Sequence, residues 1–532
     1  MQLAELPYTI PAAMDRATNE FADRQAVVDG ERQVSYRQLG ADVRRAAGAL
    51  LAAGVERGDR VAVWAPNSYE WIVIAFGIGT IGAILVPVNT RFRGEEAADV
   101  IRRTRAKVLL VSNGFLGNDY VSMVRAGAGS GDGSRPVPGL AQLSTIIDLG
   151  SAGAWDRFLA TANAIDTNAV DEAAAAVTPE DVLDIIFTSG TTGRPKGAMS
   201  THRQTIDVAY AWSERALVTS ADRYLVVNPF FHTFGYKAGF LVCMLNGATV
   251  VPMSVFDVDA VLDAVAQKRI SILPGPPTLY YSLLENPRRE SRDLSSLRLA
   301  VTGTTVVPVP LIERMRLELS FSAVVTAYGL SEAVVATMCH PGDPPQLISH
   351  SSGVAVAGFE VRVVDRAGIA VAPGTSGEIL LRGRNVMTGY FEDAEATAEA
   401  VDGDGWLHTG DIGHLDEGGY LTITDRLKDM FTVGGFNVYP AEVEQVIMRS
   451  GDVLECAVVA RPDERLGEVG VAYVVARAEH SVDAAATMTF CREKLANYKV
   501  PREVRVVSEL PRNAAGKVLK TTLRAQALVS DT

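Results

Sequence analysis

The stretch Ile186-Phe-Thr-Ser-Gly-Thr-Thr-Gly-Arg-Pro-Lys-Gly197 decides how the rest of the chain is interpreted. It begins inside an apolar run, Val182 to Phe187, which predicts a buried strand. The loop that follows offers glycines for close backbone approach, hydroxyl donors and one cation, as a polyphosphate site requires. It is not a Walker A loop, because Gly197 follows Lys196 where Ser or Thr would be needed. The candidate phosphate ligands are Thr188, Ser189, Gly190, Thr191, Thr192, Gly193 and Lys196.

Length and composition indicate a large globular protein. A chain of 532 residues is too long for one hydrophobic core and suggests about three or four folding units. The net charge of −13 disfavours a non-specific nucleic-acid surface, so no nucleic-acid partner is expected. The four cysteines are far apart without a Cys-x-x-Cys pair, which indicates reduced thiols in a cytoplasmic protein.

One stretch has nearly the length of a membrane span. Trp71 to Val88 contains eighteen residues without a charge. Three glycines interrupt it and Pro87 lies near its end, so a buried helix that runs into a buried strand over Ala83 to Val88 is the better interpretation. We expect neither a signal peptide nor an integral membrane span.

Strand-like and helix-like segments alternate along residues 1–180. Tyr36 to Ala53 has helical periodicity, and Arg60 to Trp64 and Lys107 to Val111 are short apolar strands. This alternation predicts an α/β fold with parallel sheets covered by helices. Three later strands, each ending in a polar loop that contains glycine, predict a ligand crevice where strands end: Ile270–Leu273, Leu297–Thr302 and Val324–Ala327.

The opening stretch resembles the AMP-binding signature of the adenylate-forming (ANL) superfamily, which includes acyl-CoA synthetases, peptide-synthetase adenylation domains and luciferases. Further motifs of that superfamily follow in its order: Tyr328-Gly-Leu-Ser-Glu332, Trp406-Leu-His-Thr-Gly-Asp411, Asp425-Arg-Leu-Lys-Asp429 and Pro511-Arg-Asn-Ala-Ala-Gly-Lys517. The resemblance extends from Tyr36 to Lys517. Ser331 stands where the superfamily has threonine and keeps the hydroxyl group.

The resemblance implies a domain plan. An N-terminal AMP-binding domain is expected over residues 1–425, a hinge over 426–428 and a small mobile α+β C-terminal domain over 429–532. Short alternating strands over Phe359–Val364 and Gly377–Arg382 predict a small β-subdomain within the large domain. About 100 residues after the hinge are enough for a separate domain.

The nucleotide site is expected to combine several loops. Tyr328 can stack on adenine, Ser331 can donate to the α-phosphate, and Glu332 can hold Mg²⁺. The resemblance assigns Asp411 and Arg426 to ribose, and assigns Lys517 to bridging the carboxylate and the α-phosphate. The expected catalytic residues are Lys517, Glu332 and Thr188. Gly303, Thr304 and Thr305 complete the expected ATP site.

The resemblance also implies which residues bind the acid and coenzyme A. Aromatic residues surround one histidine between Asn228 and Gly235, which predicts a wide apolar acyl pocket. Its candidate residues are Phe231, His232, Tyr236 and Thr302. A lone histidine is also common in cores and on surfaces, so a direct role for His232 stays open. Lys428 is the implied hinge, and Gly434 and Gly435 would line the tunnel for coenzyme A.

These assignments imply an ATP-dependent carboxylate–CoA ligase in the cytoplasm that works through an acyl-adenylate. Three segments resemble actinobacterial synthetases of steroid breakdown, which implies a bulky indanedione-propionate as the acid: Asn228–Gly239, Pro274–Leu284 and Asp425–Glu444. A medium- or long-chain fatty acid is the alternative substrate. A standalone adenylation enzyme, a luciferase-type oxidation and an ATP-binding regulatory protein are alternative functions, and a homodimer is an open alternative for the assembly.

Overall fold

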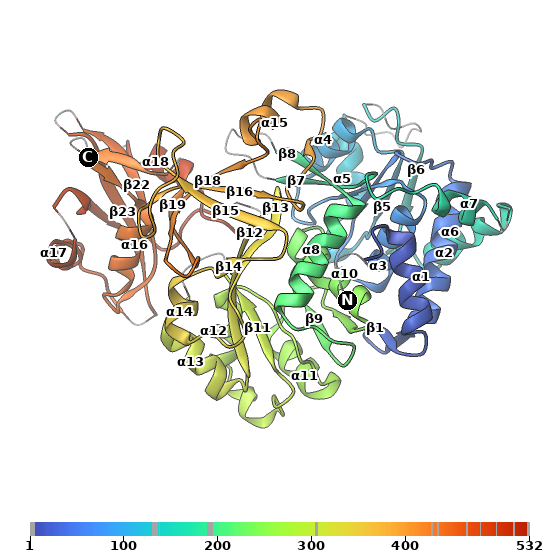
Figure 1. Cartoon of the computed structure of the whole chain (residues 1–532), viewed down its shortest axis with the longest axis horizontal. Coiled ribbons are helices and arrows are strands. Elements are labelled where there is room, and N and C mark those ends of the chain that lie inside the picture. Colours follow the sequence, from blue (N-terminus) through green and yellow to red (C-terminus); the bar gives the residue numbers. More distant parts are fainter. Residues whose placement is uncertain are drawn as a thin grey trace. The chain divides into compact units, whose positions relative to one another are not determined.

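The computed structural model describes residues 6–129, 137, 139–166, 168–188, 195–303, 307–426, 429–433, 436–463, 466–478, 480–495, 497–513 and 516–528. The chain forms two compact units (Figure 1). The first extends to Val361 and resumes over Leu381–Leu407, and the second comprises Arg362–Leu380 and the chain from His408 onward. Each unit is described by itself.

A seven-stranded sheet carries the candidate phosphate loop. Its strand order is β17-β8-β7-β4-β3-β5-β6. The strands from β7 to β6 are parallel, as the alternation predicts, whereas β8 and β17 add antiparallel pairs at one edge. The strands are β3 (Arg60–Trp64), β4 (Ile84–Pro87), β5 (Val108–Val111), β6 (Thr145–Asp148), β7 (Val182–Thr188), β8 (Lys196–Thr201) and β17 (Gly389–Tyr390).

Both faces of this sheet are covered. Alternate residues of its strands, among them Trp64, Leu109 and Ile185, form one core with α4 (Gly94–Thr104) and α5 (Tyr120–Gly127). The intervening residues, such as Val63 and Leu110, are also fully buried. Figure 1 shows α4 and α5 on one side of the strands and α1 (Ile10–Glu20), α2 (Tyr36–Ala52) and α3 (Tyr69–Thr80) on the other. Strands buried on both faces explain why these segments are continuous apolar runs.

Two four-stranded sheets also belong to the first unit. Their orders are β2-β1-β10-β9 and β11-β12-β13-β14. Ile272 forms parallel bridges to both Tyr224 of β9 and Leu299 of β11. The prediction of a full strand over Ile270–Leu273 is therefore wrong in extent, because only one bridged residue precedes the prolines that follow. The strands are β1 (Gln25–Asp29), β2 (Arg32–Ser35), β9 (Arg223–Val226), β10 (Thr249–Pro252), β11 (Leu299–Thr302), β12 (Ala323–Leu330), β13 (Ala333–Met338) and β14 (Val354–Ala355).

The later strands form two smaller sheets. One has the order β15-β16-β18-β19, and the other has β21-β20-β23-β22 with β24 paired to β23. The strands are β15 (Phe359–Val364), β16 (Gly377–Gly383), β18 (Leu407–Leu415), β19 (Leu421–Arg426), β20 (Phe431–Val433), β21 (Phe436–Val438), β22 (Val453–Asp463), β23 (Gly467–Ala476) and β24 (Glu503–Val506). The predicted β-strands at Phe359–Val364 and Gly377–Arg382 agree with β15 and β16. The boundary at residues 425–426 concerns motion and stays a prediction.

The remaining helices cover the sheets. In the first unit they are α6 (Ala154–Ala160), α7 (Ala169–Ala175), α8 (His202–Arg215), α9 (Thr233–Gly235), α10 (Leu241–Asn246), α11 (Val258–Lys268), α12 (Pro277–Glu285), α13 (Val309–Glu318), α14 (Pro345–His350) and α15 (Ala394–Ala400). In the second they are α16 (Pro440–Met448), α17 (Ala484–Lys494) and α18 (Lys520–Ala527). The uncharged run Trp71–Val88 divides between helix α3 and strand β4, as expected. Of the helices the structure describes, none is long and apolar enough to cross a bilayer.

A buried ion pair anchors β7, the strand that leads into the predicted phosphate loop. Lys237 Nζ lies 2.9 Å from Asp184 Oδ1, and both side chains are at most 1% exposed. Lys237 belongs to a π-helical turn, Tyr236–Phe240, and Asp184 lies in β7. Thr205 Oγ1 of α8 donates to the other carboxylate oxygen. Burial raises the pKa of Asp184 and lowers that of Lys237, and the attraction between the two charges opposes both shifts.

We predict that Asp184→Asn lowers the free energy of unfolding by about 3–5 kcal/mol, because it leaves Lys237 buried without its counter-charge. Chemical denaturation measures the loss. Asp23→Asn is the matched control, since the ion pair between Asp23 and Arg37 is exposed and should contribute less than about 1 kcal/mol. Equal losses in the two variants would contradict a stabilising role for the buried pair.

Candidate nucleotide and acyl site

The two ends of the candidate phosphate loop are paired. Thr188, the last residue of β7, lies opposite Lys196, the first residue of β8. Among the described residues, the partner of Thr188 Oγ1 is the Lys196 carbonyl oxygen, at a long distance of 3.4 Å. Both side chains are partly exposed, so a hydroxyl and an ammonium group lie together at one edge of the sheet. Ser189, Gly190, Thr191, Thr192 and Gly193 lie outside the described residues.

The adjacent sheet brings two further predicted segments together. Thr302 at the end of β11 pairs with Thr326 of β12, and a Cβ at Gly303 would lie 3.0 Å from the Ala327 carbonyl oxygen. The prediction that the β12 strand ends at Ala327 is wrong, because Tyr328 pairs with Thr337 of β13 and β12 continues to Leu330. Thr304 and Thr305 lie outside the described residues.

Ser331 and Glu332 form the turn between β12 and β13. Both residues are partly exposed. Glu332 Oε1 accepts a hydrogen bond from Tyr390 Oη at 2.8 Å. Lys196 Nζ lies over the ring of the same tyrosine, 5.1 Å from its centroid. The predicted metal carboxylate and the predicted phosphate lysine are therefore joined through one aromatic side chain.

The predicted acyl segment is fixed by a buried asparagine. Asn67 donates to the carbonyl oxygens of Val226 and Asn228, and its Oδ1 accepts from the Phe230 N–H. Gly235 allows the turn to close, because a Cβ there would lie 2.3 Å from the Pro229 carbonyl oxygen. These contacts constrain the backbone of the turn.

The four predicted acyl-pocket residues differ in exposure. Tyr236 is buried among the rings of Trp71 and Phe240, and Thr302 is 2% exposed. Phe231 is half-buried and His232 is exposed. Desolvation by the surrounding protein nevertheless lowers the pKa of His232. The assignment of all four to the acyl pocket stays a prediction.

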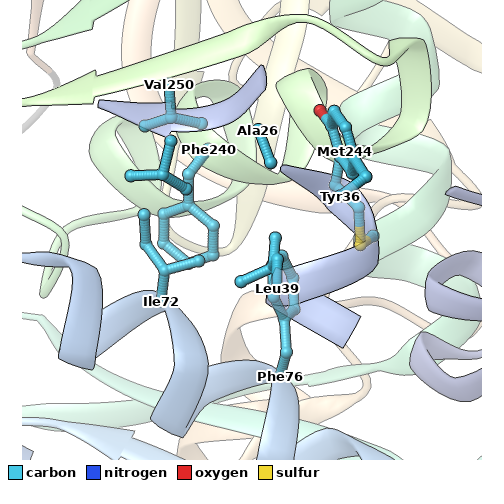
Figure 2. Close-up of a pocket in the computed structure, with 9 residues that line it drawn as sticks. Ala26, Tyr36, Leu39, Ile72, Phe76, Phe240, Met244 and Val250 are labelled. Carbon is cyan, nitrogen blue, oxygen red and sulfur yellow. The ribbon is translucent and has the colours of Figure 1, made fainter. Parts of the chain in front are cut away.

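Phe240, which packs against Tyr236, also lines a small apolar cavity. Figure 2 shows Ile72, Phe76 and Phe240 around it, with Tyr36 at its edge. The Tyr36 hydroxyl is already within 2.8 Å of the Cys243 carbonyl oxygen. A volume of about 10 Å³ holds at most about one water molecule, so the cavity is a packing gap and is too small for an acyl group.

The second unit contains the predicted ribose and lysine motifs. Asp411 of β18 and Arg426 of β19 are direct register partners. Asp411 is 6% exposed and its N–H donates to Thr409 Oγ1. Lys517 is exposed on a tight loop, where its N–H donates to Asn513 Oδ1 and Arg512 bridges to Val518. Lys428, Gly434 and Gly435 lie outside the described residues.

Comparison with known proteins identifies the family. The sequence signature of the AMP-binding enzyme matches residues 14–391, and that of the AMP-binding enzyme C-terminal domain matches residues 442–517. The chain belongs to the AMP-binding enzyme family. The predicted superfamily and fold class are thereby confirmed.

Relatives and solved structures are similar over nearly the whole chain. A 3-[(3aS,4S,7aS)-7a-methyl-1,5-dioxo-octahydro-1H-inden-4-yl]propanoyl:CoA ligase from Rhodococcus jostii is 52% identical, over 98% of this chain and 100% of the relative. The ligase of the same name from Mycobacterium tuberculosis is 50% identical, over 97% and 98%. The crystal structure of the anthranilate CoA ligase AuaEII with anthranoyl-AMP matches with a TM-score of 0.86 and 28% identity, over 99% of both chains.

Sequence reasoning missed two polar residues of this AMP-binding enzyme. The sequence alone assigns no role to Tyr390, whose partner Glu332 lies 58 residues away. It also assigns none to Lys237, which directly follows the aromatic acyl segment. An uncompensated lysine inside an apolar segment is a usable signal for a buried pair, because a buried lysine needs a counter-charge. No local signal indicates the contact between Tyr390 and Glu332.

We predict that Thr188→Val weakens ATP use by roughly tenfold or more, since a lost hydrogen bond to a charged group costs about 1.5–3 kcal/mol. The KM for ATP in AMP release measures this. Thr489→Val, at an exposed position on α17, is the matched control and should leave the KM unchanged. Unchanged ATP kinetics in a folded Thr188→Val protein would remove Thr188 from the phosphate site.

Proposed function

We propose that this AMP-binding enzyme is an ATP-dependent ligase that joins the propanoate side chain of a bicyclic, steroid-derived indanedione to coenzyme A. The observation that carries the proposal is the 52% identity, over the full length of the relative, to a ligase named for that acyl group. The Mycobacterium tuberculosis relative, which has the same name, is 50% identical in sequence to this chain. The partly exposed Thr188, Lys196 and Glu332 of the first unit support the proposal, since they suit a metal-bound polyphosphate.

The first step activates the carboxylate. A carboxylate oxygen attacks the α-phosphorus of ATP, the bond to the bridging oxygen breaks, and pyrophosphate leaves to give an acyl-adenylate. Such a transfer depends on positioning and charge neutralisation. Thr188 and Lys196 hold the departing phosphates, Tyr328 and Ser331 contact the adenosine and α-phosphate, and Lys517 neutralises the charge around the α-phosphate.

Glu332 suits a magnesium ion that is shared with ATP. Among the residues the structure describes, no group of three histidine, cysteine or acidic side chains could hold a metal alone. Mg²⁺ typically takes one or two protein carboxylates together with substrate phosphates and water, which matches one partly exposed carboxylate near a phosphate loop. When bound, Mg²⁺ neutralises charge on the phosphates.

The second step transfers the acyl group. The thiol sulfur of coenzyme A attacks the acyl carbonyl carbon, the carbon–oxygen bond to phosphate breaks, the thiol proton is released, and AMP leaves. Lys517 would then be replaced at the reacting centre by the coenzyme A tunnel at Gly434 and Gly435, through rotation of the C-terminal domain about Lys428. Asp411 and Arg426, paired across β18 and β19, hold the ribose throughout. A cytoplasmic location is consistent with these substrates.

We predict that bulky ring-bearing propionates have a kcat/KM at least about tenfold higher than acetate or straight-chain fatty acids, because an apolar pocket discriminates by about 1–3 kcal/mol per misplaced methylene. AMP release with ATP, coenzyme A and a panel of acids measures the preference. A clear preference for palmitate would support the fatty-acid alternative, and a preference for acetate would reject a wide pocket.

We predict that Lys517→Ala slows acyl-adenylate formation by on the order of 10²–10³, as does the loss of comparable electrostatic contacts elsewhere. It should still convert synthetic acyl-adenylate and coenzyme A into thioester. Lys428→Pro should do the reverse, since proline fixes φ at the pivot. Each half-reaction is measured separately. Loss of the same half-reaction in both variants would contradict domain alternation.

A further inference from the structure

The backbone of Tyr390 is fixed with respect to the strand that follows the phosphate loop. Tyr390 pairs with Ala198 of β8, and its N–H donates to Thr397 Oγ1 at 2.9 Å. Gly389 has φ +153°, and a Cβ there would lie 2.9 Å from Thr397 Cγ2. A glycine directly before the tyrosine is therefore required for this close approach.

The same segment is tied to the turn that carries Glu332. The Met387 N–H donates to the Glu332 carbonyl oxygen at 2.7 Å, and Val386 bridges to Ala333. At the other end of the segment, the Phe391 N–H donates to the Gly197 carbonyl oxygen at 2.8 Å. Residues 386–391 therefore join two elements that are far apart in the sequence, the β12–β13 turn and the start of β8.

The hydroxyl group of Tyr390 contacts a negative charge, and its ring face contacts a positive charge. Its hydroxyl donates to Glu332 Oε1, and burial together with the Glu332 charge raises the pKa of Tyr390, so the hydroxyl stays protonated. Among the described residues, Glu332 Oε2 accepts no hydrogen bond. The face of the ring, which is electron-rich, meets the ammonium of Lys196.

Lys196 and Glu332 contact the same tyrosine at different places, the ring face and the hydroxyl group. Lys196 and Glu332 are both described, and neither forms an ion pair with a described residue. A direct pair between them would consume the cation that a phosphate needs and the carboxylate that a cation needs. Both side chains are partly exposed, so each charge can meet a ligand from solvent.

We propose that Tyr390 is a positioning residue for the adenylation step, whose hydroxyl orients Glu332 toward the magnesium of Mg-ATP and whose ring holds Lys196 apart from that carboxylate. The inference rests on the proposed function for the roles of Glu332 and Lys196. It adds to that function two separate roles for one side chain, one for the hydroxyl group and one for the ring. Two substitutions distinguish these roles.

Tyr390→Phe removes the hydroxyl and keeps the ring, and Tyr390→Leu removes both. With Mn²⁺ as the probe and α,β-methylene-ATP as the nucleotide, electron paramagnetic resonance of free Mn²⁺ gives the metal affinity of the complex. We expect Tyr390→Phe to weaken Mn²⁺ binding about tenfold, as loss of a hydrogen bond to a carboxylate does. Calorimetry in EDTA should show unchanged metal-free nucleotide affinity for Tyr390→Phe and a roughly two- to fivefold weaker one for Tyr390→Leu.

Tyr210→Phe is the matched control, since among the described residues no hydrogen bond involves the Tyr210 hydroxyl on α8, and it should bind Mn²⁺ as the unchanged protein does. In a double-mutant cycle, Tyr390→Phe should add little to Glu332→Gln, because the hydroxyl acts on the metal only through the Glu332 carboxylate, which Glu332→Gln removes. Wild-type Mn²⁺ affinity in Tyr390→Phe, or additive losses in the cycle, would overturn the proposal. These affinities need no acid substrate, so absence of AMP release with every acid would count against the proposed function alone.

Discussion

The pairing of Thr188 with Lys196 is the constraint on which the site in the first unit depends. It fixes both ends of the loop that should receive the phosphates, and it makes β8 return antiparallel beside β7. β7 is in turn held by β4 on its other edge and by the Lys237–Asp184 pair at its buried face. The antiparallel edge thus brings together the two ends of the predicted phosphate loop.

The first unit contains a buried pair of opposite charges and, nearer the surface, two charged groups that do not pair with each other. Lys237 and Asp184 are fully buried and form an ion pair, so neither charge meets solvent. Lys196 at the start of β8 and Glu332 in the β12–β13 turn stay partly exposed, and both contact Tyr390. The partly exposed cation and carboxylate are the two groups that we propose meet a metal-bound polyphosphate.

The sequence predicted elements where one local signal dominates. Arg60–Trp64 and Phe359–Val364 are strands with the expected bounds, and the division of Trp71–Val88 into helix and strand is confirmed, because burial on both faces gives long apolar runs. The sequence-based prediction failed where the bounds of a strand depend on its pairing with another segment. Tyr328 stays in β12 only because Thr337 pairs with it, and Ile272 keeps a single bridge because prolines follow. The motifs named the residues of the site, whereas the contact of Glu332 with Tyr390 depends on a fold that brings residues 58 apart together. The roles of His232 and Lys517 stay predictions.

The central claim is that the carboxylic acid is activated as an adenylate before coenzyme A takes part. Exchange of radiolabelled pyrophosphate into ATP tests it most directly, because that exchange requires reversible cleavage between the α- and β-phosphates. The account predicts exchange that depends on the indanedione-propionate and on Mg²⁺, proceeds without coenzyme A, and falls by on the order of 10²–10³ in Lys517→Ala. Exchange that requires coenzyme A, or formation of ADP and phosphate in place of AMP and pyrophosphate, would contradict it.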